Sequence, residues 1–288
     1  MHSKKSAIDY YDQTHVDYRL LWQVDRTLSM HFGYYDRNVK THDAAVINMN
    51  KVLAKKVKIN SNDVVLDAGC GIGGSAIWLA KTFGCKVIGI TLSEKQAFRA
   101  KELSKRNNVE DLAHFFIRDF TNTKFPNYSF DVVWAIESVC HAKNKKDFLA
   151  EAHRILKKGG RLIVADGFLK KENLTHVEKN YMDKWLDGWA VPNLASISEF
   201  DNYTKKLGFK NIKFADITKN AMPSSIHLYV AGFLGYPLGK FLELISIRTK
   251  LQTKNMIAAY NQYNQYITLK EGLWAYGVFN AEKGTKSS

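Results

Sequence analysis

The sequence has few cysteines and no recognisable metal-binding motif. Its 288 residues include three cysteines, Cys70, Cys85 and Cys140, an odd number that is too small for a disulfide framework. No C-x-x-C pair occurs, and the nine histidines form no H-x-x-x-H or H-E-x-x-H pattern. We therefore expect free thiols, a reducing cytoplasmic setting and no bound metal.

A long uninterrupted apolar run is also missing. Residues 1–7 are polar and basic, which predicts no signal peptide. The most apolar segment, residues 226–247, is interrupted by Gly232, Gly235, Pro237 and other breaking residues, whereas a spanning helix needs about 20 mostly apolar residues. It is better interpreted as a buried or substrate-covering pair of helices, and contact with a membrane surface stays open as an alternative.

Acidic residues are fewer than basic ones. The formal net charge is +14 and the pI about 9.5. The lysines lie in scattered pairs, without the interleaved aromatic residues that a groove for single-stranded nucleic acid needs. Most of this charge is interpreted as solvated surface, so no nucleic-acid partner is expected. A phosphorylated substrate or an anionic membrane is favoured over RNA as an anionic partner.

Strands and helices alternate from residue 60 onward, after a segment, 1–59, that looks helical and contains one glycine, Gly33. This alternation predicts an α/β fold with a doubly wound, seven-stranded, Rossmann-like sheet. Helical inserts are expected near 170–200 and 222–268. The last expected strand follows a long excursion, which suits an edge of the sheet. The expected strands are Val64–Leu66, Lys86–Ile90, Phe115–Ile117, Val132–Ala135, Leu162–Ala165, Ile212–Ala215 and Leu273–Ala281.

A glycine-rich loop follows the first strand and fits two cofactors. The segment LDAGCGIGGSA matches G-x-G-x-x-G of dinucleotide sites and also D-x-G-x-G-x-G. A dinucleotide site needs an acid at the end of the second strand, about 20 residues on, but that strand ends in Ile90 and Thr91. Asp67 would repel pyrophosphate and would suit the positive amino group of S-adenosylmethionine. The sequence therefore favours S-adenosylmethionine.

Several segments resemble class I S-adenosylmethionine-dependent methyltransferases. VVLDAGCGIGGSA resembles their first motif, and similar matches are KVIGITLSEKQ, FIRDF, FDVVWAIESVCHA and ILKKGGRLIVAD. YYDQT, MHFGYYD and IESVCHA resemble the subgroup acting on sterol C-24, tocopherols and small natural products. WLDGWAVPNLASISEFDNYTKKLGF is similar to its tocopherol-type members. The resemblance covers residues 8–218, and the C-terminal insert after it matches nothing we know.

The resemblance implies an N-terminal helical lid, residues 1–59, over a methyltransferase domain, residues 60–288. Tyr11 and His31 would lie in lid helices and cover the cofactor, although plain helix packing explains them equally well. Asp119 would lie near the adenine amino group. The full set expected to contact the cofactor is Tyr11, His31, Asp67, Gly69, Gly71, Gly73, Thr91, Leu92, Gln96, Asp119, Phe120 and Ala135.

Three residues are candidates for catalysis. His141 follows the fourth strand, on the edge where doubly wound folds bind ligands, and has a suitable pKa for taking a proton. In similar sugar methyltransferases a histidine here and an aspartate ending the fifth strand act in catalysis, and they match His141 and Asp166. Glu137 would bridge substrate and cofactor, as the sterol enzymes imply. The alternatives are that His141 orients Glu137, that Asp166 caps a turn and that Glu137 makes a structural hydrogen bond.

The insert after the fifth strand carries Tyr181, Trp185 and Trp189, an aromatic cluster that would line an apolar substrate pocket or simply pack in the core. The sequence thus predicts methyl transfer from S-adenosylmethionine to a small, apolar or amphipathic acceptor. A tocopherol-like phenol, a sterol, terpenoid or prenyl carbon, or a natural-product oxygen or nitrogen would fit. The alternatives are a dinucleotide-dependent oxidoreductase and an RNA- or membrane-binding module. Monomer and homodimer remain equally open.

Overall fold

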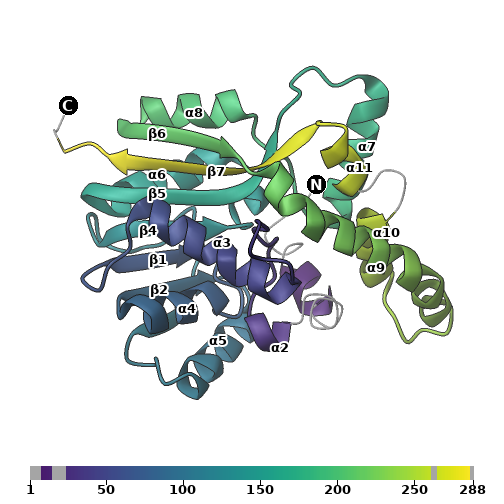
Figure 1. The fold of residues 1–288 in the computed structure, drawn as a ribbon, viewed down its shortest axis with the longest axis horizontal. Coiled ribbons are helices and arrows are strands. Elements are labelled where there is room, and N and C mark those ends of the chain that lie inside the picture. Colours follow the sequence, from purple (N-terminus) through teal and green to yellow (C-terminus); the bar gives the residue numbers. More distant parts are fainter. Residues whose placement is uncertain (1–7, 15–23, 261–264, 286–288) are drawn as a thin grey trace.

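Seven strands form one mixed sheet in the computed structural model, which describes residues 8–14, 24–260 and 265–285. The strand order is β3-β2-β1-β4-β5-β7-β6 (Figure 1). Neighbours from β3 to β5 pair in parallel, and β7 is antiparallel to both β5 and β6. The strands are β1 (Val64–Ala68), β2 (Lys86–Thr91), β3 (Ala113–Ile117), β4 (Phe130–Ile136), β5 (Leu156–Leu169), β6 (Phe209–Asp216) and β7 (Trp274–Lys283).

Helices cover both faces of the sheet, and each face has its own apolar core (Figure 1). The core on one face includes Met49 and Leu53 of α3, and the core on the other includes Phe148 of α6 and Phe200 of α8. Residues 8–14 are also helical. The remaining helices are α2 (Val24–Thr27), α3 (His42–Val57), α4 (Gly74–Phe83), α5 (Glu94–Arg106), η1 (Val139–His141), α6 (Lys145–Ile155), α7 (His176–Gly188), α8 (Ile197–Lys206), α9 (Thr218–Leu244), α10 (Lys250–Tyr260) and α11 (Gln265–Lys270).

The last strand does not lie at the edge of the sheet, so that expectation was wrong. β7 is inserted between β5 and β6, and β6 forms the edge. The reason is visible in burial: the first six residues of β7 are all buried, whereas β6 is buried only at Phe209. A strand that is apolar on both faces is stable only where helices cover both faces and strands flank both sides.

The N-terminal segment is less helical than expected. Residues 28–40 are irregular, so His31 and Phe32 lie between α2 and α3 and not in a helix. Their backbone is instead held by distant groups: the Gly33 N–H donates to Ser224 Oγ at 2.9 Å, and the Phe32 N–H donates to Glu137 Oε1 at 2.6 Å. Gly33 also packs so closely that a Cβ there would lie 2.5 Å from Ala45 Cβ.

Two helix ends have specific local contacts. Ser93 caps α5, since its hydroxyl accepts from the Gln96 N–H. Gln96 does not return a hydrogen bond, because its Oε1 accepts from the Thr91 hydroxyl at 2.7 Å. After α6 the chain enters β5 at Leu156, so Gly159 (φ +74°) lies within the strand.

The C-terminal insert is helical, as expected, and consists of α9, α10 and α11. Residues 226–247 do not form the expected buried pair of helices: most of them belong to the single helix α9, and many of their large apolar side chains are exposed. In Figure 1, α9 and α10 extend together away from the sheet. Pro223 and Pro237 lie inside α9. None of the helices that the structure describes combines the length and apolar character that crossing a bilayer requires.

Candidate active site

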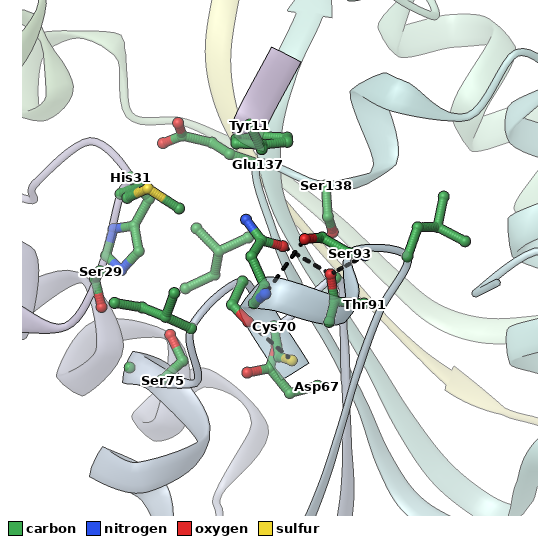
Figure 2. Close-up of a pocket in the computed structure, with 18 of the residues that line it drawn as sticks. Tyr11, Ser29, His31, Asp67, Cys70, Ser75, Thr91, Ser93, Glu137 and Ser138 are labelled. Carbon is green, nitrogen blue, oxygen red and sulfur yellow. Dashed lines mark hydrogen bonds between the residues drawn. The ribbon is translucent and has the colours of Figure 1, made fainter. Parts of the chain in front are cut away.

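A cavity lies over the carboxyl ends of β1, β2 and β4, where α/β sheets bind ligands. We call it the glycine-loop cavity; it measures about 910 Å³ including its open mouth. Figure 2 shows Asp67, Cys70 and Ser75 on one side of it, and Tyr11 and Glu137 on the other. The residues predicted to contact the cofactor that do line it are Tyr11, His31, Asp67, Gly69, Gly71, Thr91, Leu92, Gln96 and Phe120.

The glycines bring the loop backbone close to its surroundings. Gly69 has φ +92°, and a Cβ there would lie 2.3 Å from Ser138 Cβ. Gly73 has φ +89°, but a Cβ there would meet the Phe115 ring at 2.7 Å, so Gly73 serves packing and does not line the cavity. Gly74 at the start of α4 lines it instead. This loop therefore presents bare backbone to a ligand.

Asp67 is the decisive group in this cavity. Its side chain is 3% exposed, and its Oδ2 has no hydrogen-bond partner in the part of the chain that the structure describes. Burial raises the pKa of Asp67 to about 7, although a backbone hydrogen bond from Ala76 counteracts this. A buried carboxyl group without a partner is costly, and a cationic amino group would satisfy it. A negatively charged pyrophosphate would not.

The end of β2 supplies a polar, uncharged rim. The Thr91 hydroxyl orients Gln96, and the Ser93 N–H donates to Thr91 Oγ1 at 3.2 Å. The Ser93 hydroxyl donates to Asp12 Oδ1 at 2.7 Å, and Lys95 forms an ion pair with the same carboxylate at 3.3 Å. The helical residues 8–14 are thereby tied across the rim of the cavity.

Two other predicted cofactor contacts lie outside the lining. Asp119 accepts hydrogen bonds from the backbone and hydroxyl of Thr121, both at 2.8 Å. Its neighbours Arg118 and Phe120 line the cavity. Ala135 is buried in the core, and Ile136 takes the position expected for it. The lining residues that were not predicted include Ser29, Ser138 and Arg118. Ser138 and Arg118 lie in the quoted segments IESVCHA and FIRDF, but the resemblance assigned them no role.

His31 is neutral at physiological pH, because burial lowers its pKa to about 4. Its Nδ1 lies 2.9 Å from the Phe32 carbonyl oxygen. A carbonyl can only accept, so Nδ1 carries the proton and Nε2 is an acceptor. Nε2 has no partner among the described residues. The cavity therefore contains a second buried polar atom that a ligand's donor could satisfy.

A second cavity of about 610 Å³, including its mouth, adjoins the first. We call it the aromatic cavity. Trp185 and Trp189 line it, as predicted, and their rings meet edge-to-face at 5.5 Å. Tyr181 does not line it. No lysine or arginine is among its lining residues as far as the described chain shows. Its seven aromatic side chains, histidine excluded, are Tyr10, Tyr11, Phe32, Trp185, Trp189, Trp274 and Tyr276.

Glu137 lies between the two cavities and lines both. Its backbone is in the left-handed region (φ +46°), an uncommon conformation that a non-glycine residue keeps only when its surroundings fix it. Oε1 accepts from the Phe32 N–H and from the Tyr276 hydroxyl, both at 2.6 Å. Burial raises the pKa of Glu137 to about 8 against these hydrogen bonds. At neutral pH the carboxyl group is therefore largely protonated.

His141 also lines both cavities. Its Nδ1 lies 3.2 Å from the Ala190 carbonyl oxygen, and its Nε2 lies 2.8 Å from the Tyr11 hydroxyl. Because the carbonyl only accepts, Nδ1 carries the proton and Nε2 accepts from Tyr11. The imidazole is thus held in the tautomer that a general base requires, with its basic nitrogen at the junction of the cavities.

Asp166 lines the aromatic cavity, but its oxygens are engaged by the backbone. Oδ2 accepts from the Cys140 N–H at 2.9 Å, and Oδ1 accepts from the Gly167 N–H at 2.8 Å. Burial raises its pKa. Lys145 secures the same loop through the carbonyls of Cys140 and Ala142. These contacts favour the turn-capping interpretation of Asp166.

The chain is similar to known methyltransferases. A family model described as a methyltransferase domain matches residues 66–164. Tocopherol O-methyltransferase of Arabidopsis thaliana is 30% identical over 76% of this chain and 67% of its own length. The chain belongs to the S-adenosylmethionine-dependent methyltransferases. This methyltransferase is also 39% identical to 2-methyl-6-phytyl-1,4-hydroquinone methyltransferase of Synechocystis sp., over 63% of this chain and 59% of that protein.

The fold agrees with the family. A geranyl diphosphate methyltransferase structure in complex with GPP and sinefungin superposes with a TM-score of 0.77 at 19% identity, covering 97% of this chain and 99% of the other. This methyltransferase uses S-adenosylmethionine, and the glycine-loop cavity with its unpartnered Asp67 oxygen fits that group. Within the described ranges, no cluster of His, Cys, Asp and Glu could hold a metal ion.

Proposed function

We propose that this methyltransferase acts on a neutral, largely apolar acceptor with an aromatic hydroxyl group, such as a prenylated phenol or hydroquinone. The main support is the aromatic cavity, whose described lining has seven aromatic side chains and no lysine or arginine. This cavity meets the glycine-loop cavity at His141 and Glu137. The relatives named for tocopherol and phytyl-hydroquinone methylation support this class.

The donor would be held in the glycine-loop cavity. Asp67 would pair with its amino group, and the bare backbone at Gly69 and Gly71 would allow close approach. When bound, S-adenosylmethionine supplies an electrophilic methyl group on a sulfonium. The residues of this chain position the acceptor against it and exclude water, since methyl transfer requires close, aligned reactants.

His141 is proposed to remove the acceptor's proton. Its Nε2 is unprotonated in the observed tautomer and lies at the junction of both cavities, where it accepts from Tyr11. An acceptor hydroxyl would replace the Tyr11 hydroxyl there or reach His141 through it. Deprotonating a phenol makes both its oxygen and its ring carbons more nucleophilic, so one base serves O- and C-methylation.

The charge state of the aromatic cavity favours a neutral acceptor over a diphosphate. Glu137 is largely protonated at neutral pH, and its hydrogen bonds with Phe32 and Tyr276 hold it in the cavity wall. A diphosphate would find no lysine or arginine among the described residues of the lining. The surrounding aromatic rings also suit a carbocation, which makes an alkene carbon the second candidate acceptor.

Labelled methyl transfer tests the proposal. The purified protein would be incubated with methyl-labelled S-adenosylmethionine and, separately, a phytyl hydroquinone, a sterol with a side-chain alkene, and geranyl diphosphate with Mg²⁺. We expect label in the phytyl hydroquinone, with the methylated atom located by mass spectrometry. If label appeared only in the sterol, the proposed acceptor would be an alkene carbon instead of a phenol. Transfer to geranyl diphosphate alone would overturn the neutral acceptor.

A further inference from the structure

The outer half of α9 carries an unusual concentration of exposed apolar side chains. Nine of the fourteen large exposed hydrophobic residues in the described chain fall within residues 226–247. Leu244 is 82% exposed, and Leu234 and Ile247 are each 71% exposed. We call this set the arm surface. It comprises Ile226, Val230, Phe233, Leu234, Leu238, Phe241, Leu244, Ile245 and Ile247.

Packing through glycines explains why these side chains face outward. Beyond Leu228 the buried positions of α9 are Gly232 and Gly239. Met256 of α10 packs against the backbone there: a Cβ on Gly239 would lie 2.8 Å from Met256 Sδ, and one on Gly235 would lie 2.9 Å from its Cε. Because α9 uses its small residues to contact α10, its large apolar residues remain on the other side.

Basic groups flank the arm surface at its tip. Lys240, Arg248 and Lys250 surround a surface hollow that Phe241 and Leu244 also line. The one carboxylate in this lining belongs to Glu243, whose Oε1 lies 3.3 Å from Lys240 Nζ. Among the described lining residues, Lys240 and Lys250 together outweigh the single carboxylate of Glu243, which leaves the hollow positive. Exposed apolar side chains beside cations are the pattern of helices that lie in a membrane interface.

We propose that the arm surface docks onto an anionic lipid bilayer. Leu234, Leu244 and Ile247 enter the boundary between headgroups and acyl chains, and Lys250 faces lipid phosphates. Charge favours a bilayer over a second copy of the chain. Each copy carries a net charge of +14 and would bring the same cations together across a symmetric contact.

The location of the arm surface links it to the site. Leu228, one turn before Gly232 on the same helix, lines the aromatic cavity. Docking would therefore hold that cavity near a membrane in which an apolar acceptor dissolves. Bilayer binding goes beyond the proposed reaction and is measured without any methyl transfer, so either can fail without the other.

Co-sedimentation with vesicles tests the docking. Vesicles of phosphatidylcholine with about 30% phosphatidylglycerol would be compared with phosphatidylcholine alone. We expect the protein to bind the anionic vesicles, and a rise to about 0.5 M salt to weaken binding. Leu244→Ser with Ile247→Ser should reduce the partition coefficient at least tenfold, by the apolar burial that it removes. Lys250→Glu should reduce it about fivefold or more.

Phe98→Ser is the matched control, because Phe98 is 65% exposed and lies on α5, away from the arm surface. It should bind vesicles as the unaltered protein does. Lys250→Glu and the salt series decide the matter if the double variant does not fold. Equal binding by all variants, or no preference for anionic vesicles, would overturn the proposal. The proposal would also be overturned if light scattering showed that the unaltered protein is a dimer and that the variant with Leu244→Ser and Ile247→Ser is a monomer.

Discussion

The two cavities of this methyltransferase meet at Glu137 and His141 but are built in different ways. The glycine-loop cavity takes most of its lining from the carboxyl ends of β1, β2 and β4 and the segments that directly follow them. The aromatic cavity is assembled from residues that lie as far apart as Tyr10 and Tyr276. The first presents bare backbone and a buried carboxyl group, and the second presents aromatic rings.

This difference separates the general part of the reaction from the specific part. A donor common to a whole family can be held by a short contiguous motif on a parallel sheet. In the proposed division, the acceptor would be held by residues of α7 and β7, which lie outside the donor loop. Variants on either side should therefore change one binding step and leave the other intact.

The largest effect is expected at the junction. His141→Gln removes the proposed base and should lower kcat for a hydroxylated acceptor about 10²- to 10⁴-fold. The dissociation constant of S-adenosylhomocysteine should change less than about threefold. Steady-state kinetics and calorimetric titration measure the two quantities. An unchanged kcat would remove His141 from the chemistry, and lost donor binding would place it in the donor site instead.

The next largest effect isolates the glycine-loop cavity. Asp67→Asn should weaken S-adenosylmethionine binding by about 2–3 kcal/mol, because it removes the carboxylate that pairs with the amino group. The melting temperature of the Asp67→Asn variant at pH 8 should not be lower than that of the unaltered protein. The raised pKa of Asp67, about 7, means that its ionisation destabilises the ligand-free fold as pH rises through 7. A lower melting temperature at pH 8, or unchanged affinity, would contradict this account.

The same carboxyl group predicts a pH dependence of donor binding alone. Only the ionised form of Asp67 pairs with an ammonium group, and its pKa in the ligand-free protein is about 7. The dissociation constant of S-adenosylmethionine should therefore rise about tenfold per pH unit below 7. Titrations between pH 5 and 8 would measure it. Asp67→Asn should abolish this slope, and a slope that persists in the variant would assign it to another group.

The smallest predicted effect tests whether the aromatic cavity binds the acceptor. Trp189→Leu should raise the acceptor KM about tenfold by removing apolar contact, with donor affinity unchanged. Trp78→Leu is the matched control, since Trp78 lies on α4, packs against Phe83 and lines neither cavity. Initial-rate measurements on both variants decide the matter. Equal effects on KM would attribute the change to general destabilisation.

Most residues predicted to contact the donor line one cavity, because the sequence signals that identify them are local. The loop from Asp67 to Gly74 and the His141 position follow strands whose apolar runs identify them. The structure brings these residues to one edge of the sheet. Asp119, Ala135 and Gly73 were predicted to contact the cofactor, yet their neighbours line the cavity. A motif fixes a position along the chain more closely than it fixes where a side chain points.

The aromatic side was only partly predictable, because tertiary contacts create it. Trp185 and Trp189 could be recognised as part of an aromatic cluster, because they lie close together in the sequence. Trp274 and Tyr276 reach the cavity only because β7 pairs between β5 and β6, and strand order cannot be read from periodicity. Phe32 reaches it because Glu137 holds its backbone N–H.

The ratio of kcat/KM for a phytyl hydroquinone to kcat/KM for geranyl diphosphate with Mg²⁺ tests the central claim most directly. Both acceptors carry a prenyl chain. Only the second carries a diphosphate, which keeps a net negative charge with one Mg²⁺ bound, and the described lining of the aromatic cavity offers it no lysine or arginine. The account predicts a ratio of at least about 100 at neutral pH, since an unpaired charge is costly to bury. A ratio below one would show that the cavity is built for an anionic acceptor and would contradict it.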